Sequence, residues 1–214
     1  MKGKAPRTAN VYEAKNGDGE PSKNMPIILF LGRDVKEYVS ESATIIKRHI
    51  DDGNIRCAKC LRPMRTHSKY GRGIKETGER IIIIIVWCSK CRAWHALLPD
   101  FLIGYKHYSG NEIESVIIDS GAEPVSNIET EASEATARRW IKQVGTRVVQ
   151  AVGILKYLFG RAGQAVSEVA IDAGPAYSEL EQVLEMAPAP VKYSGNKLGL
   201  ANIWLGTSGT AAYI

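Results

Sequence analysis

The chain has 214 residues, of which 44% are hydrophobic and 24% charged, and its net charge is +5. This length and composition suit one larger domain or two small ones with a buried core. The longest apolar run, residues 81–87, is far shorter than the roughly 20 residues of a membrane helix, so we expect no membrane partner and a cytoplasmic protein. Residues 1–110 carry the basic excess and residues 111–214 are net acidic, which favours a polyanionic partner for the first half.

The first elements follow from simple patterns. Residues 1–24 are rich in Lys, Gly, Pro, Asn and Ser and predict a flexible basic tail. The apolar run at 27–31 predicts a short buried strand. Asp34 is placed as the N-cap of a helix that continues to Ile50, and the Asp-Asp-Gly sequence at 51–53 ends that helix.

All four cysteines occur in two Cys-x-x-Cys pairs, Cys57/Cys60 and Cys88/Cys91. Two intervening residues allow a tight turn whose backbone amides point at the sulfurs, and two such turns complete a tetrahedral site. The 27 residues between the pairs suffice for a strand, a turn and a returning strand. We therefore predict a zinc ribbon with one structural Zn²⁺, although iron in a rubredoxin-like site would use the same ligands.

Other interpretations of these residues fit less well. A redox motif would need a thioredoxin-like strand and helix around each pair. Structural disulfides would need an oxidising compartment, and we expect none because no apolar signal-peptide core precedes the ribbon. His67 and His95 could approach the metal, but four thiolates already complete a closed site, so we leave both histidines out of the ligand set.

Residues 65–70 and 79–87 predict the two strands of the ribbon. Residues 81–86 are all β-branched and predict the strand that delivers Cys88 to the metal. Because both faces of this strand are apolar, it needs cover on each side. We expect the strand at 27–31 to join the ribbon sheet.

The second half predicts helices. The proline-interrupted segment 97–102 is interpreted as a packed connector from the ribbon. Ser109 begins a capping box for a helix at 111–119. A short helix over 125–132 and a third that starts after Ser133 would complete a helix-turn-helix.

The helix that follows Ser133 has the pattern of a recognition helix. Apolar residues at 137, 140, 141 and 144 form a buried stripe, and Thr, Arg, Lys and Gln side chains lie off that stripe. The candidate DNA contacts on this helix are Thr136, Arg138, Arg139 and Lys142. The ribbon would add phosphate contacts through Arg65, Lys69 and Arg72.

Beyond Gly145, the pattern predicts a separate helix at 148–159, another at 177–186, and an apolar tail at 198–205 that docks on the helical core. The expected fold class is α+β, with a small zinc-ribbon β-sheet domain followed by an all-α helix-turn-helix region. The expected parts are the tail 1–24, a ribbon domain 25–106 with its N-terminal strand and helix, a helix-turn-helix 107–146, and a C-terminal helical extension 147–214.

Several motifs together resemble a known group of proteins. These are the two cysteine pairs, Met-Arg-Thr-His-Ser-Lys-Tyr-Gly-Arg at 64–72, Cys-x-x-Cys-Arg-x-x-His at 88–95 and Ala-Leu-Leu-Pro-Asp-Phe-Leu at 96–102. They resemble uncharacterised bacterial zinc-ribbon proteins related to the N-terminal regions of transposases. The resemblance is strongest over 55–110, extends loosely to Thr-x-Arg-Arg-Trp at 136–140, and departs at 103–104, where a proline is expected. It implies DNA binding, with the ribbon cysteines as zinc ligands.

These patterns favour a binding protein over an enzyme. The sequence shows no strand-borne carboxylates for two metals, no nucleophile with a base and no phosphate loop, so we expect neither a complete transposase nor another enzyme. We expect a partner of double-stranded DNA, acting as a transposase-related accessory factor or a transcriptional regulator. The alternative is a zinc-ribbon interaction module that docks on a transposase-type or polymerase-type protein, and either form could be a homodimer.

Overall fold

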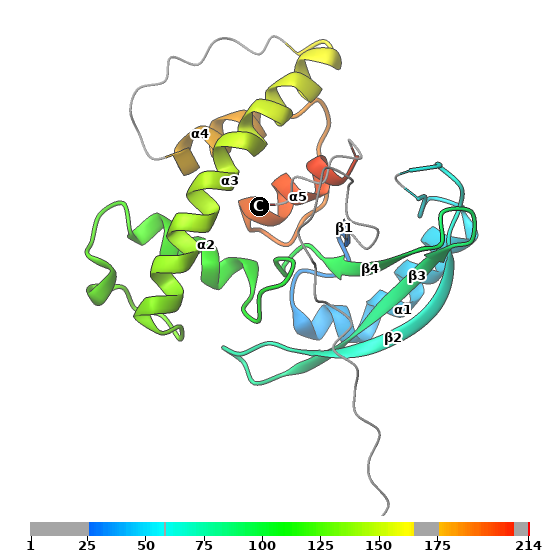
Figure 1. Cartoon of the computed structure of the whole chain (residues 1–214), viewed down its shortest axis with the longest axis horizontal. Helices are drawn as coiled ribbons and strands as arrows, with labels where there is room; N and C mark the ends of the chain where they lie inside the picture. Colours follow the sequence, from blue (N-terminus) through cyan, green and yellow to red (C-terminus); the bar gives the residue numbers. More distant parts are fainter. Residues whose placement is uncertain (1–25, 58, 165–175, 208–213) are drawn as a thin grey trace, which may run out of the picture.

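The computed structural model describes residues 26–57, 59–164, 176–207 and 214; the tail expected at 1–24 lies outside them. Figure 1 shows a twisted sheet with one helix along it beside a group of helices arranged around one long helix. The elements in chain order are β1 (Ile27–Leu29), α1 (Val35–Asp51), β2 (Arg65–Gly73), β3 (Arg80–Cys88), β4 (Ala93–Pro99), α2 (Gly110–Asp119), the 3₁₀ turn η1 (Val125–Asn127), α3 (Glu134–Arg161), α4 (Ala176–Glu185) and α5 (Lys197–Thr207).

The sheet has the strand order β1-β4-β3-β2, with β1 parallel to β4 and the other pairs antiparallel. The prediction that the strand at 27–31 joins the ribbon sheet is confirmed, because Ile28 pairs with Leu98. The connector prediction was wrong in part: Leu97 and Leu98 belong to β4. Pro99 falls at the last position of β4, where the missing N–H does not interrupt the ladder.

Helix α1 is positioned by its cap and by one side-chain contact. The Asp34 carboxylate accepts a 2.9 Å hydrogen bond from the backbone N–H of Glu37, as predicted. The Tyr38 hydroxyl donates to the carbonyl of Ile82 at 2.6 Å. Ile82 lies two residues before Ile84, the first residue of β3 that pairs with β4. Figure 1 shows α1 running along the sheet. The helix thus satisfies a backbone group that β4 leaves without a partner.

The second half folds around α3, which is one helix of 28 residues. The predicted break at Gly145 was wrong, because the buried stripe continues through Val148, Leu155 and Phe159. Burial of that stripe outweighs the roughly 1 kcal/mol that a glycine costs inside a helix. Helix α4 occurs where the sequence predicts a helix, and the apolar tail expected at 198–205 docks on the same core in the form of helix α5, which was not predicted to be helical. Leu180 of α4 and Leu205 of α5 are among the buried residues.

The second helix of the expected helix-turn-helix is reduced to the 3₁₀ turn η1. The reason lies in the side chain of Glu112, which accepts hydrogen bonds from the Thr130 hydroxyl at 2.5 Å and from the Glu131 N–H at 2.9 Å. These bonds hold the chain before α3 in a non-helical form. The Ser109 cap of α2 is confirmed, but only half of the capping box forms, because the Ser109 N–H donates to Glu76 instead of Glu112.

The two parts have separate cores, one around the sheet and α1 and one around α3. They are joined by polar contacts at the segment that follows β4. The buried Asp100 carboxylate accepts a 2.6 Å hydrogen bond from the Ser194 N–H, and the Lys75 N–H donates to the His107 carbonyl at 2.8 Å. No described helix combines the length and the apolar character of a membrane span.

Candidate functional site

The four cysteines meet at one end of the sheet. Cys57 and Cys60 precede β2, Cys88 is the last residue of β3, and Cys91 lies in the turn that leads into β4. All four Sγ atoms lie within 4.8 Å of one another, and the Sγ atoms of Cys60 and Cys88 are 3.5 Å apart. The predicted convergence of the two pairs is confirmed.

These distances fit a metal site. Zn–S bonds of about 2.3 Å in a tetrahedron place the sulfurs roughly 3.8 Å apart, whereas a disulfide needs about 2.05 Å. All four cysteines are free, and the 3.5 Å separation of Cys60 and Cys88 is close to the tetrahedral value. A closed set of four thiolates can hold one metal ion in a structural role and leaves no open position for a substrate.

Each of the two cysteine pairs is followed by a residue in the left-handed backbone region. Leu61 and Arg92, each directly after the second cysteine of its pair, have φ values of 58° and 51°. The N–H of Cys91 donates to the Cys88 sulfur at 3.5 Å, and the N–H of Leu61 donates to the Cys57 carbonyl at 2.8 Å. The left-handed residue lets each turn fold tightly under its sulfurs, at a position that glycine adopts more easily.

The sulfurs influence one another electrostatically. A hydrogen bond from the backbone N–H of Arg62 lowers the pKa of the Cys60 thiol to about 7. Burial raises the pKa of Cys88, and the hydrogen bond with the Cys60 sulfur raises that of Cys91. The raised pKa values of Cys88 and Cys91 disfavour their thiolate forms, and a bound dication would supply the compensating positive charge.

Neither histidine near the ribbon belongs to the cysteine cluster. His95 is buried on β4 opposite Val86 of β3. The exposed His67 instead lies against Trp87 and Trp94, with ring centroids 5.9 Å and 6.3 Å away. The sequence analysis did not single out this aromatic group. The signal was the presence of a tryptophan on each side of the Cys88–Cys91 turn, which places the two rings opposite each other only once β4 is recognised as a strand.

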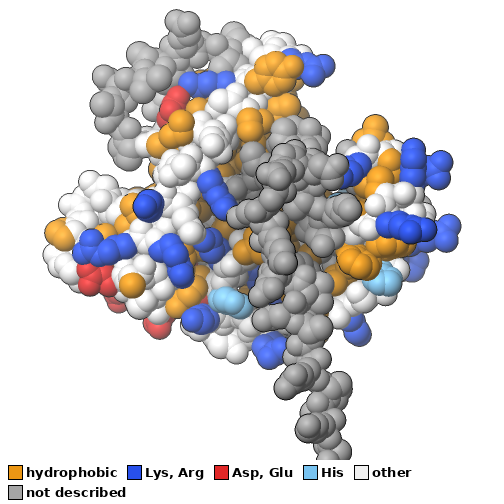
Figure 2. Space-filling view, viewed as in Figure 1, with side chains coloured by type: hydrophobic (Ala, Val, Ile, Leu, Met, Phe, Trp, Pro, Cys, Tyr) orange, Lys and Arg blue, Asp and Glu red, His pale blue; other side chains and the backbone are white. Residues whose placement is uncertain are grey.

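A basic group lies on α3. Arg139, Lys142 and Arg147 are exposed, and in the described part of the chain none has an ion-pair partner. Lys106, which follows β4, also contacts α3, because its side chain donates a hydrogen bond to the Gln143 side chain. Burial is the main cause that lowers the pKa of Lys106, and the positive charges of Arg147 and Arg139 lower it further. Figure 2 shows many more basic than acidic side chains on this face of the molecule.

Lys106 and Arg147 were missed in the sequence. Arg147 follows Arg139 by eight residues, which is the same side of one continuous helix. The interpretation of Gly145 as a helix end hid that relationship. Lys106 is brought to α3 by the segment that follows β4, and no local pattern marks it.

The predicted DNA contacts differ in their surroundings. Arg138 is exposed and pairs with Glu134 at 2.5 Å, and the half-buried Thr136 has its hydroxyl 3.0 Å from that of Ser133. Arg65 and Lys69 are exposed on β2. Arg72 is a correction: its side chain is buried, and its guanidinium donates to backbone carbonyls. It therefore cannot serve as a phosphate contact.

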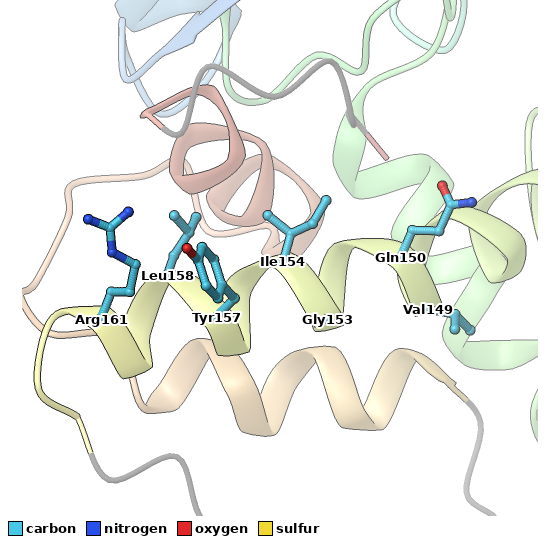
Figure 3. A pocket seen from close by; sticks show the side chains of 7 residues that line it. All are labelled: Val149, Gln150, Gly153, Ile154, Tyr157, Leu158 and Arg161. Atoms are coloured by element: carbon cyan, nitrogen blue, oxygen red, sulfur yellow. The ribbon is translucent and has the colours of Figure 1, made fainter. Parts of the chain in front are cut away.

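One open depression runs along the second half of α3 (Figure 3). The exposed side chains of Val149 and Tyr157 flank it, and Arg161 is its only charged lining residue. Among the described residues, its lining contains no carboxylate, histidine or cysteine. The complete lining is Val149, Gln150, Gly153, Ile154, Tyr157, Leu158 and Arg161.

A family described as a domain of unknown function (DUF6431) matches residues 57–140. The matched region begins at the first cysteine of the metal site and ends at Trp140 in α3, so it contains all four cysteines and the start of the basic helix. The chain is similar to this family over that region. No curated protein and no solved structure matches the chain.

Proposed function

We propose that this chain is a zinc-stabilised DNA-binding protein in which α3 contacts the duplex. The observation that carries the proposal is the group of exposed cations Arg139, Lys142 and Arg147, which has no carboxylate partner in the described residues. Unpaired like charges on one side of a helix repel one another, and a line of phosphates would neutralise them with release of counterions.

Zinc has a structural part in this proposal. The ion would hold the two cysteine turns together and so fix the exposed Arg65 and Lys69 on β2, where they add phosphate contacts. With η1 in place of the second helix, α3 does not enter the groove as part of a compact helix-turn-helix. We place its exposed side along the duplex, with Arg139 and Lys142 nearest to base edges. The resemblance to transposase N-terminal regions supports a role as an accessory factor or a transcriptional regulator.

Fluorescence anisotropy with a labelled random-sequence duplex tests this proposal. We expect the combined Arg139→Ala, Lys142→Ala and Arg147→Ala variant to bind much more weakly than the zinc-loaded wild type. Lys47→Ala is the matched control, because Lys47 is an exposed cation on α1 that pairs with Asp51 at 2.5 Å. Equal weakening by both variants would show non-specific charge effects, and undiminished binding of the triple variant would reject α3 as the DNA contact.

A second candidate function is docking on another protein, and the depression along α3 favours it. Val149 and Tyr157 are 61% and 64% exposed, and large apolar side chains at such exposure are common at interaction surfaces. If this surface binds a protein, Tyr157→Asp should abolish recovery of a nuclease-resistant partner in a pull-down and leave duplex binding intact. Retained recovery would reject the surface.

A further inference from the structure

A second surface of the ribbon carries aromatic rings outside the metal site. The rings of His67, Trp87 and Trp94 lie within 5.2–6.3 Å of one another, with interplanar angles of 22–37°. Trp94 is 42% exposed, His67 is also exposed, and Trp87 is half-buried. We call these three residues the aromatic platform. None of the three residues belongs to either of the two buried cores.

The strand register explains why the platform forms. Trp87 pairs directly with Trp94 on β4 and with Arg65 on β2. Directly opposed residues of antiparallel strands project from the same face, so Arg65, Trp87 and Trp94 make one row across three strands. The register of β2 shifts between Thr66 and Ser68, which identifies His67 as the extra residue of a bulge. Bulges redirect a side chain, and here the redirected ring reaches both tryptophans.

The charge around the platform has one sign. Arg65 belongs to the same cross-strand row as the two tryptophans, and Lys90 and Arg92 are exposed in the turn between Trp87 and Trp94. Residues 53–75 and 80–99 contain no aspartate or glutamate. Figure 2 shows blue side chains around orange ones on the ribbon, at the right of the view. The rings are therefore framed by exposed Lys and Arg side chains, which would attract an anionic partner.

We infer that the aromatic platform binds an unpaired nucleic-acid strand, with bases stacked on Trp94 and His67 and phosphates held by Arg65, Lys90 and Arg92. Exposed aromatic rings within a basic surface are the recognition chemistry of single strands, because every base has a π-face and every nucleotide a phosphate. A duplex keeps its base faces stacked internally, so it cannot use the rings. The inference goes beyond duplex binding by α3 and assigns a separate surface to a separate form of nucleic acid.

The test titrates the zinc-loaded full chain with a short oligo(dT) and follows tryptophan fluorescence. Stacking of a base on Trp94 should quench the emission. Trp94→Ala should remove most of that quenching and weaken binding by about tenfold, as expected for the loss of one stacked base. Trp94→Phe should keep most of the affinity because it keeps a π-face. Tyr157→Ala, at an exposed aromatic residue of α3, is the matched control and should bind like the wild type.

Because Trp94 also pairs with Trp87 across the strands, zinc content and the thermal melt of each variant are measured first. His67→Ala is the second variant, since the bulge position carries less of the sheet, and it should weaken oligo(dT) binding several-fold. Unchanged oligo(dT) affinity in folded, zinc-loaded Trp94→Ala or His67→Ala protein would overturn the inference. So would an absence of quenching in the wild type, or quenching by an acidic peptide at the same concentration.

The outcome is separable from that of the duplex experiment. The Arg139→Ala and Arg147→Ala changes should reduce duplex binding and leave the oligo(dT) quenching intact, and Trp94→Ala should do the opposite. If the α3 variants abolish both activities, the platform is not an independent site and the inference fails. If duplex binding fails in the wild type and oligo(dT) quenching persists, the platform stands without the proposed function of α3.

Discussion

Arg72 of β2 donates a 2.8 Å hydrogen bond to the carbonyl of Ile103, which lies between the sheet and the helices. A second bond from the same Nη2 atom reaches the carbonyl of Lys106. The side chain is buried, so the guanidinium satisfies two backbone acceptors that have little access to water. Together with the Lys75 to His107 backbone hydrogen bond, this side chain connects the ribbon to the segment that carries Lys106.

Arg72→Ala should therefore destabilise the protein. We expect a loss of about 2–3 kcal/mol in the free energy of unfolding, because the charged hydrogen bonds from the guanidinium to two backbone carbonyls are lost. Lys69→Ala, at an exposed site of the same strand, should change stability by less than about 0.5 kcal/mol. Urea unfolding measures both. Equal midpoints for the two variants would show that Arg72 is not a structural residue.

Loss of one sulfur should release the metal. Cys88→Ser removes a ligand at the end of β3, and because metal binding is coupled to folding of the ribbon, we expect loss of zinc and of tertiary structure in the first half. The helical circular-dichroism signal of the second half should persist. Ser89→Ala, the exposed neighbour, should retain one zinc per chain. Zinc retention and an unchanged melt in Cys88→Ser would contradict the ligand assignment.

The left-handed residues of the cysteine turns should respond to glycine. Leu61 has φ 58° and a side chain that is 67% exposed, so Leu61→Gly relieves backbone strain and gives up little burial. After the entropic cost of glycine, we expect a gain of about 0.5–1 kcal/mol in the zinc-loaded protein. Leu61→Ala keeps the Cβ atom and should bring no gain. Guanidinium unfolding at saturating zinc measures the difference, and identical stabilities of the Gly and Ala variants would show that no strain is present.

Stability should depend on the protonation of Asp100. Burial raises the pKa of this carboxyl to about 6, and its Oδ1 atom is buried without a hydrogen-bond partner among the described residues. The folded state therefore holds the proton more tightly than the unfolded chain, whose aspartates titrate near pH 4. The free energy of unfolding should fall between about pH 4 and pH 6 and then level off, by about 3 kcal/mol at most.

Asp100→Asn isolates this contribution, because the amide carries no charge in either state. The difference in unfolding free energy between wild type and variant should change across that window and stay constant above about pH 7. A constant difference from pH 4 to pH 7 would show that Asp100 does not titrate between the two states. Urea midpoints at a series of pH values provide the comparison.

The elements with a strong local signal could be predicted from the sequence. Asp34 and Ser133 mark helix starts because their side chains cap orphan N–H groups, whatever the rest of the fold does. The two cysteine pairs predict one another because four thiolates complete one closed tetrahedral metal site. The strand at 27–31 was placed in the sheet correctly, since an apolar run needs cover on both faces.

The errors have one physical origin, which is tertiary contact overriding local preference. Gly145 continues a helix because the flanking residues are buried together, and 128–132 stays non-helical because Glu112 binds its backbone. The sequence pattern predicts that Arg72 is an exposed cation. Only the folded structure shows that the carbonyls of Ile103 and Lys106 accept hydrogen bonds from it. The aromatic platform depends on strand register and on a bulge, neither of which a single strand pattern specifies.

The most direct test of DNA binding by α3 is the salt dependence of duplex affinity. The logarithm of the association constant should fall linearly with the logarithm of salt concentration, with a slope that reports the phosphates neutralised. Replacement of Arg139 and Arg147 by alanine should weaken binding and make the slope shallower by about one for each residue that contacts a phosphate. A slope identical to that of the wild type, or no duplex binding by the zinc-loaded wild type at low salt, would contradict the account.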